Sequence, residues 1–497
     1  MYSAFNWLDM LLVLLFYICA CSADQEYDYS SAVDTLVELI PLERYYYGNL
    51  SAFADKMEAK LNTIRRALSK MQPVLKAAED TQELFVGNPL RAYSLLRHVH
   101  HDWPNWLDFM EESVGAEEIK HFRSLELLLP NQTDMADAAL GLEHIQDIYG
   151  QTERDLASGL LHGQQHNVQL AAMDCWSLGR HYYHLSRYVE ASVWLGLAAE
   201  RYNVSEEDLY AVQGFHRVEL WQLQAASLMR QNRNEDALAV IIGALEKLPW
   251  DMRLQSLRSR LQSRWLVRPR LEYGEEPLPP ANYMQRGCRG QYPLKTSLHC
   301  RFGWIPSYAR LKMEELQLDP YIVLYHDVVS ANEIAFLKIY ARMNLTQDPQ
   351  KILAKRCAIP ESIPQLESLN RRMEHMTGLS LNRSESWIIT NYGIGGFFGL
   401  HKDYFDEIEE ELRGDNRLYT IQIFLSNVSQ GGHTVFPQLE VSVKPQAGSS
   451  LVFYNLLDSL EGDPRTSHFA CPVLDGDKWI ATKWLSAKEQ IFQKSRK

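Results

Sequence analysis

The stretch SHFACPVLDGDKWIATKWL, residues 467–485, decides the fold of the C-terminal region. It holds two short runs rich in β-branched and aromatic residues, separated by the polar turn LDGD. Similar runs occur upstream, namely SWIITNY, RLYTIQIFLSNV, HTVFP, VSVKP and SSLVFYN. Many short strands punctuated by Gly, Asp and Pro are typical of a sandwich or jelly roll that holds a ligand between two sheets. We therefore predict a β-rich domain of this class over residues 286–490.

Residues 24–165 follow helical rather than strand periodicity. Apolar residues at three- and four-residue steps form one stripe, at Leu50, Phe53, Met57, Leu61, Ile64, Leu68 and Met71. A stripe of this kind predicts a long amphipathic helix. It could pack within the chain or against a second copy, and the pattern alone does not separate these alternatives.

Two segments between residues 166 and 265 fit the roughly 34-residue tetratricopeptide pattern of stacked helix pairs. The matching positions are Leu178, Gly179, Tyr182, Ala191 and Ala198 in the first segment, and Ala237, Ala244 and Pro249 in the second. Stacked helix pairs form concave grooves, so we expect either a peptide-binding module or a purely structural pair of hairpins. The Pro- and Gly-rich residues 266–285 are predicted to be a linker.

Composition and the N-terminus indicate the compartment. The chain has 497 residues and a formal net charge of −13, which argues against nucleic-acid binding. The apolar run MLLVLLFYICAC predicts a signal peptide over residues 1–23, and no later stretch is apolar enough for a membrane span. Sequons for N-glycosylation fit the secretory pathway; they begin at Asn49, Asn131, Asn203, Asn344, Asn382 and Asn427.

Removal of the signal peptide would leave an odd number of cysteines, Cys175, Cys288, Cys300, Cys357 and Cys471. At least one thiol is then free or pairs between chains. Cys288 and Cys300 are close in sequence, and a bond between them would stabilise the fold by about 3 kcal/mol or less. We predict this disulfide.

The triplet His401-Lys402-Asp403 is the first candidate for a metal site. Alternate residues of a strand face the same way, so His401 and Asp403 could hold one ion while Lys402 faces solvent. A third ligand could come from His433 or His468. Two histidines and one carboxylate with open positions are typical of non-haem Fe(II) oxygenases, although zinc also accepts these ligands.

Lys478 favours iron and favours His468 as the third ligand. It follows His468 by ten residues and has apolar neighbours, where a buried ammonium requires an anionic partner. A dicarboxylate cosubstrate that chelates iron at one end would supply that partner. His98, His100, His101 and Asp102, and likewise His162 and His166, lack a strand scaffold and are predicted to lie on solvated helix faces.

Taken together, the motifs NYGIGGFFGLHKDYF, GGHTVFP, FYNL and EGDPRTSHFACPVLDGDKWIATKWL closely resemble the collagen prolyl 4-hydroxylase α subunits. The resemblance implies a helical N-terminal dimerisation domain (24–165), a tetratricopeptide-like peptide-binding domain (166–265) and a double-stranded β-helix oxygenase domain (286–490). It also implies that His401, Asp403 and His468 hold Fe(II), that Lys478 binds the distal carboxylate of 2-oxoglutarate, and that Tyr392 lies near this cosubstrate. His433 is not a ligand in relatives, which favours a surface histidine on a turn.

The implied reaction couples O2 and the decarboxylation of 2-oxoglutarate to succinate and CO2 with hydroxylation of proline at C4, and ascorbate restores oxidised iron. The implied partner is protein disulfide isomerase, the β subunit of an α2β2 tetramer in the lumen of the endoplasmic reticulum. Tyr182, Tyr183 and Tyr188 are candidates for the peptide groove, whereas Leu223 and Ala226 replace tyrosines of relatives. Two alternatives stay open: a non-catalytic peptide-binding subunit, and a sibling hydroxylase with a non-collagen substrate. Relatives pair the cysteine matching Cys471 with one near the C-terminus that this chain lacks, so Cys357 or a free thiol could take its place.

Overall fold

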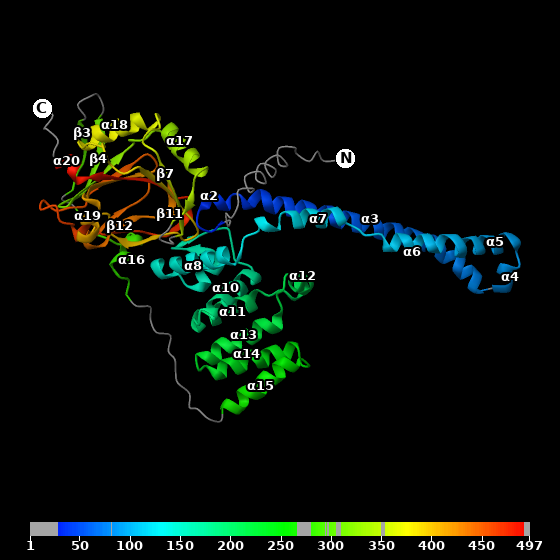
Figure 1. The fold of residues 1–497 in the computed structure, drawn as a ribbon. Coiled ribbons are helices and arrows are strands. Elements are labelled where there is room, and N and C mark those ends of the chain that lie inside the picture. Colours follow the sequence, from blue (N-terminus) through cyan, green and yellow to red (C-terminus); the bar gives the residue numbers. More distant parts are fainter. Residues whose placement is uncertain are drawn as a thin grey trace. The chain divides into compact units, whose positions relative to one another are not determined.

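The computed structural model describes residues 28–80, 82–265, 280–293, 295, 298–304, 310–348 and 353–491 (Figure 1). The predicted signal peptide and most of the predicted linker lie outside these residues. The chain divides into two compact units, one containing Leu36–Asn131 and the other Asp28–Thr35 with Gln132–Lys497. The domain boundary expected near residue 165 therefore falls inside the second unit. Across the described residues, no helix combines the length and apolar character that a membrane span requires.

The first unit is built on α3 (Leu39–Asp80), which carries the predicted apolar stripe. The chain then continues through α4 (Gln82–Val86), α5 (Pro89–Arg97), a π-helix (His98–Asp102), α6 (Trp103–Glu111) and α7 (Ala116–Ser124). Phe53 packs closely against the turn before α7, since a Cβ at Gly115 would lie 2.1 Å from its ring. Leu50, Met57 and Leu68 are instead exposed. Only part of the stripe therefore packs within the chain.

From Gln132 onward, the second unit first contains helices that stack through small residues. They are α8 (Gln132–Tyr149), α9 (Glu153–Ser158), α10 (Ala172–His184), α11 (Tyr188–Arg201), α12 (Glu207–Val212), α13 (Arg217–Arg230), α14 (Asn234–Lys247) and α15 (Met252–Trp265). Gly179 lets α10 approach α11, because a Cβ there would lie 2.6 Å from Cγ of Leu195. Ala191, Ala198 and Ala237 are completely buried. The helices predicted from these small residues are confirmed.

The remainder of the second unit contains two facing sheets. The larger sheet has the strand order β3-β4-β5-β14-β10-β17-β8-β7-β6 and the smaller one the order β13-β12-β15-β9. The strands of the larger sheet are β3 (Cys300–Trp304), β4 (Arg310–Leu318), β5 (Tyr321–His326), β6 (Thr346–Gln347), β7 (Ala354–Ile359), β8 (Trp387–Tyr392), β10 (Arg417–Phe424), β14 (Ser450–Tyr454) and β17 (Trp479–Ser486). Those of the smaller sheet are β9 (Phe398–His401), β12 (Thr434–Phe436), β13 (Val441–Val443) and β15 (His468–Ala470). Each strand run quoted from the sequence is confirmed as a strand.

Apolar side chains fill the space between the sheets. Phe424 and Phe453 of the larger sheet pack in one cluster with Phe436, Val441 and Ala470 of the smaller sheet. On its other face, the larger sheet is covered by α17 (Ala331–Arg342) and α18 (Leu366–Thr377). These two helices were not expected from the sequence pattern. The arrangement places β9 and β15 opposite β8, β10 and β17.

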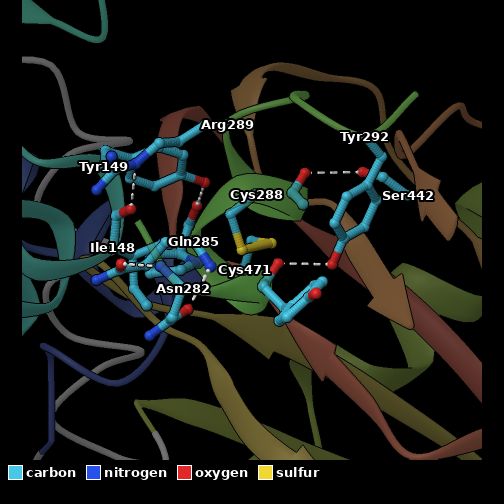
Figure 2. Close-up of a disulfide and its surroundings, with 12 residues drawn as sticks. Ile148, Tyr149, Asn282, Gln285, Cys288, Arg289, Tyr292, Ser442 and Cys471 are labelled. Carbon is cyan, nitrogen blue, oxygen red and sulfur yellow. Dashed lines mark hydrogen bonds between the residues drawn. A yellow bond between two sulfur atoms is a disulfide. The ribbon is translucent and has the colours of Figure 1, made fainter. Parts of the chain in front are cut away.

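The predicted disulfide between Cys288 and Cys300 is wrong. Cys288 is bonded to Cys471, 183 residues away (Figure 2). Cys300 is an exposed free thiol. Cys288 ends α16 (Tyr283–Cys288), a helix that is held on both sides. Gln285 donates to the carbonyl of Asp147 at the end of α8, and Ser442 on β13 donates to the carbonyl of Gly287. These contacts direct Cys288 toward the end of β15. Because Cys471 is bonded to Cys288, Cys357 is not its partner.

Cys288→Ser is expected to destabilise the protein strongly, whereas Cys300→Ser should be nearly neutral. A bond that closes a loop of this length contributes about 5 kcal/mol in the chain-entropy model. Thermal unfolding of both variants under non-reducing conditions measures the difference. Equal midpoints for the two variants would contradict the Cys288–Cys471 pairing.

Candidate active site

The register of the smaller sheet brings the two predicted histidine ligands together. β9 and β15 are antiparallel, and His401 pairs directly with His468. Asp403 lies in the bend after β9 rather than on the strand, so strand alternation was only a partial reason for its orientation. Ligand atoms of His401, Asp403 and His468 nevertheless lie within 4.8 Å of one another. Within the described part of the chain, this is the one group of three such residues that could hold a metal ion.

Backbone carbonyls fix the orientation of both imidazole rings. Nδ1 of His401 lies 2.7 Å from the carbonyl oxygen of Gly399, and Nδ1 of His468 lies 3.1 Å from that of Thr466. An Nδ1–H that donates to a carbonyl leaves the lone pair of Nε2 free for a metal. The Nε2 atoms lie 3.8 and 3.9 Å from the carboxylate oxygens of Asp403. The donors therefore converge on one point.

Protonation states in this cluster also suit a divalent cation. Burial and the neighbouring His468 lower the pKa of His401 to about 3, so its ring is neutral at physiological pH. Burial alone would raise the pKa of Asp403, but His468, His401 and the Thr420 hydroxyl hold it below its ordinary value. Neutral imidazoles and an ionised carboxylate are the forms that ligate Fe(II) or Zn(II).

A buried hydrogen-bond relay holds the carboxylate of Asp403. The Thr420 hydroxyl on β10 donates to Oδ2 of Asp403 at 2.6 Å, and the side-chain amide of Asn455 donates to that hydroxyl at 2.9 Å. Sequence reasoning missed both residues, because a single Thr or Asn in a strand region has no distinguishing pattern. Oδ1 of Asp403, which takes no part in the relay, faces Nε2 of His401, while Oδ2 lies near Nε2 of His468.

Thr420→Val is expected to weaken Fe(II) binding or turnover by about 10- to 100-fold, the usual loss when a group that orients a metal ligand is removed. Valine has a similar shape but cannot donate to Asp403. Thr420→Ser keeps the hydroxyl and should stay near the wild-type level. Titration of the apoprotein with Fe(II) under argon measures the change, and equal affinities for the Val and Ser variants would refute the orienting role.

Lys478 lies immediately before β17 and is 0% exposed. Its Nζ has no hydrogen-bond partner within the described residues and lies 4.7 Å from the ring centre of Tyr392, at the end of β8. Burial lowers the pKa of Lys478 to about 7. Burying an unpaired ammonium is costly, so this arrangement fits an anion that enters the site. A carboxylate of 2-oxoglutarate has the required charge.

The cavity beside the metal donors is lined by both sheets. Its walls are Arg356, Ile388, Thr390, Tyr392, Phe398, His401, Asp403, Gln422, Thr434, His468, Ala470, Ile480, Thr482 and Trp484. Tyr392 is thus a wall residue, and Lys478 lies next to its ring without being part of the wall itself. Arg356 was not foreseen from the sequence; it forms an ion pair with Asp348, whose side chain is fully buried. The alternation of Ile480, Thr482 and Trp484 on β17 is the signal that could have identified that wall.

His433 is separate from the donor cluster, and its side chain is only partly exposed. Its ring is half-buried beside the start of β12, and its Nδ1 has no hydrogen-bond partner among the described atoms. Burial and the nearby charge of Lys478 lower the pKa of His433 to about 4. The segment 162–166 is also not helical, because it includes the turn and the second strand of a short hairpin formed by β1 (Leu160–Leu161) and β2 (Gln164–Gln165).

The three tyrosines predicted for the peptide groove differ in accessibility. Tyr182 is buried, and its hydroxyl donates to Gln146, so its ring belongs to the core rather than to a binding surface. Tyr183 and Tyr188 are half-buried and pack edge to face with ring centres 5.4 Å apart. Arg230 lies over the ring of Tyr188. Tyr183 and Tyr188 therefore stay candidates for contact with a peptide.

Parts of the chain match two known protein families. Residues 32–163 match the family described as prolyl 4-hydroxylase alpha-subunit, N-terminal region, and residues 387–486 match the 2OG-Fe(II) oxygenase superfamily. Prolyl 4-hydroxylase subunit alpha-1 of Rattus norvegicus is 27% identical, over 95% of this chain and 96% of its own length. Subunit alpha-1 of Homo sapiens is also 27% identical, over 93% and 94% of the two chains.

Subunit alpha-2 of Caenorhabditis elegans shows the same 27% identity, over 97% of this chain and 95% of its own. The match to the 2OG-Fe(II) oxygenase superfamily covers His401, Asp403, His468 and Lys478. The match to the α-subunit N-terminal region covers most of the helical N-terminal region. The similarity thus extends over nearly the whole chain and includes both regions. The chain is thus similar over nearly its whole length to prolyl 4-hydroxylase α subunits, and its C-terminal region matches the 2-oxoglutarate- and Fe(II)-dependent oxygenases.

Proposed function

We propose that the chain hydroxylates proline at C4 in Pro-rich, collagen-like secreted polypeptides. The observation that carries this proposal is the combination of three converging metal donors with Lys478, a fully buried cation that lacks a hydrogen-bond partner within the described residues. A zinc hydrolase would need the donors but would have no use for such a lysine. A non-catalytic subunit would need neither.

The roles of the residues follow from their positions. His401, Asp403 and His468 would hold Fe(II), which when bound supplies the activation of O2 coupled to decarboxylation of 2-oxoglutarate to succinate and CO2. Lys478 pairs with the distal carboxylate of 2-oxoglutarate, and Tyr392 forms the wall beside it. The remaining wall residues exclude bulk water from the cavity. Ascorbate serves as the reductant that restores oxidised iron.

The finer architecture of the chain belongs to the same proposal. The two facing sheets form a double-stranded β-helix over residues 286–490, and the stacked pairs α10–α11 and α13–α14 form a tetratricopeptide-like peptide-binding domain over 166–265. Residues 24–165 serve dimerisation, with the exposed stripe of α3 as their surface. Residues 1–23 are the signal peptide and 266–285 the linker.

Assembly and compartment are proposed from the similarity to prolyl 4-hydroxylase α subunits. The protein disulfide isomerase β subunit is the partner in an α2β2 tetramer, which is held in the lumen of the endoplasmic reticulum. The sequons make the chain a glycoprotein, and the Cys288–Cys471 bond requires an oxidising compartment. A polyproline II peptide is the substrate form, because it is already ordered when it meets a groove lined by Tyr183 and Tyr188.

Co-expression with protein disulfide isomerase allows a direct test. Succinate release and 4-hydroxyproline formation would be followed on (Pro-Pro-Gly)-type and poly-proline peptides, with Asp403→Ala as the inactive control. Release of succinate with 4-hydroxyproline in the peptide supports the proposal. Absence of turnover on every peptide, with Fe(II) demonstrably bound, would refute the enzymatic function. Turnover on poly-proline alone would favour the non-collagen alternative, which the burial of Tyr182 and the residues Leu223 and Ala226 motivate.

A further inference from the structure

Residues Asp28–Thr35, which we name the strap, precede the long helix α3 in sequence but belong to the unit that contains the oxygenase region. Tyr29, Ser30, Ser31 and Ala32 are only 0–3% exposed. Most of these residues are polar or small, and apolar burial alone does not account for their position. Buried backbone polar groups require partners, so the contacts of the strap identify what it does.

The strap forms hydrogen bonds with three elements of the second unit, which together we name its seat. Oδ1 of Asp134, in α8, accepts from the backbone N–H of Tyr29 at 2.6 Å and from that of Ser30 at 3.2 Å. Nζ of Lys355, in β7, donates to the carbonyl of Asp28. The backbone N–H of Ile394, after β8, donates to the carbonyl of Ser30 at 3.3 Å.

The strap also explains the first glycine of the NYGIGG motif. A Cβ at Gly393 would lie 2.0 Å from the carbonyl oxygen of Ser30 and 2.6 Å from the carbonyl carbon of Ser31. A side chain at this position is therefore incompatible with the seated strap. The loop that follows Tyr392 is shaped to receive residues from the other end of the chain.

One side chain connects the strap to the lysine of the cosubstrate pocket. The backbone N–H of Asp34 donates to Oδ1 of Asn391 at 3.1 Å, and Asn391 is completely buried. Nδ2 of Asn391 donates to Oδ1 of Asp477 at 2.6 Å and to the carbonyl oxygen of Lys478 at 3.1 Å. The same carbonyl accepts from the backbone N–H of Tyr392. The strap thus reaches the backbone of Lys478 through a single intervening residue.

This connection matters because the Lys478 ammonium has no hydrogen-bond partner of its own in the described structure. Its position depends on its backbone and on packing against Tyr392. We infer that the strap is a positioning element that, through Asn391, holds Lys478 in place for the distal carboxylate of 2-oxoglutarate. The inference rests on the proposed function, in which Lys478 anchors that carboxylate.

A matched pair of full-length variants isolates the connecting hydrogen bond. Asp34→Pro removes the backbone N–H that donates to Asn391. Asp34 is the second residue of α2 (Val33–Leu36), where proline is tolerated because the N–H has no acceptor within the helix. Asp34→Ala keeps that N–H but, like the proline variant, loses the carboxylate that pairs with Arg342 at 2.7 Å. The difference between the two variants therefore reports the Asn391 contact.

The measurements are the 2-oxoglutarate KM, kcat at saturation, and the affinity of the Zn(II)-loaded, inactive protein for 2-oxoglutarate by calorimetry. Asp34→Pro should raise both KM and Kd about tenfold relative to Asp34→Ala, as expected when one hydrogen bond to a buried group is lost. The kcat at saturation should be the same for both variants. A general loss of folding would lower kcat as well, so this split separates positioning from instability.

Gly393→Ala provides an independent disruption, with Gly243→Ala as its control because a Cβ at Gly243 meets nothing within 4 Å. Hydrogen exchange at the amides of residues 29–31 shows whether the strap has left its seat. Release of the strap with weaker 2-oxoglutarate binding supports the inference. Release with unchanged binding, or equal affinities for the two Asp34 variants, would overturn it. A wild-type protein that binds no 2-oxoglutarate at all would instead refute the proposed function.

Discussion

His468→Ala is expected to abolish both stoichiometric Fe(II) binding and turnover. His468 supplies one of the three converging donors, and its Nδ1 contact with Thr466 already fixes the ring for ligation through Nε2. The loss should exceed the roughly 10- to 100-fold effect typical of residues that only orient a metal ligand, because here the ligand itself is removed. Iron content after anaerobic reconstitution, measured together with succinate release, checks both parts.

His433→Ala is the matched control for this experiment. His433 was the competing candidate for the third ligand, but it lies outside the donor cluster. The control should retain one equivalent of Fe(II), and its fold should tolerate the loss of a half-buried ring. If His433→Ala lost the metal while His468→Ala kept it, the assignment of the third ligand would be wrong.

The donor cluster could be predicted from the sequence because its evidence is local and redundant. His401 and Asp403 are two residues apart, and Lys478 follows His468 at a spacing that places a buried cation near the same site. The exact geometry could not be predicted. Asp403 reaches the cluster from a bend, and the register of β9 with β15, rather than strand alternation, brings His401 beside His468.

The disulfide and the strap show where sequence reasoning failed. The short loop between Cys288 and Cys300 suggested that these two cysteines pair. Cys288 instead pairs with Cys471, because α16 holds it at the end of β15. The strap has no periodicity, and its burial depends on Asp134, Lys355 and Gly393, which are distant in sequence. Tertiary contacts of this kind leave no signal in the local pattern.

Lys478→Met should have two opposite effects, namely loss of 2-oxoglutarate binding and a gain in the stability of the ligand-free protein. Methionine has a similar length without the charge, so the distal carboxylate would lose its ionic partner. A buried charged pair that loses one member typically weakens binding by about 2–5 kcal/mol, or some 30- to several thousandfold. Calorimetry with the Zn(II)-loaded protein measures this effect, and iron binding should persist because Lys478 is not a donor.

The gain in stability follows from the pKa of Lys478, which burial lowers from 10.5 to about 7. Between these values the unfolded chain binds a proton that the folded chain does not, so stability of the wild-type protein rises with pH from about 7 toward 10.5. Below about pH 7 the full cost of burying the charge applies. Each tenfold loss of proton affinity on folding costs about 1.4 kcal/mol. A fall in pKa from 10.5 to about 7 then corresponds to about 5 kcal/mol for the charged lysine, so Lys478→Met should stabilise the protein by several kcal/mol near neutral pH. Thermal unfolding of the metal-free proteins at several pH values measures this gain.

The same titration sets the sign of the pH dependence of cosubstrate binding. The groups around Lys478 are the ring of Tyr392, the half-buried His433 and the carboxylate of the adjacent Asp477, and none of them forms a hydrogen bond or an ion pair with Nζ within the described residues. Above about pH 7 the ligand-free lysine is largely neutral, so 2-oxoglutarate binding must take up a proton and its affinity should fall. Lys478→Met should bind weakly at every pH and show no such dependence. Lys478 would not be the anchor if Lys478→Met kept the wild-type affinity, or if the affinity of the wild-type protein rose with pH. A different anion would then have to pair with the buried lysine.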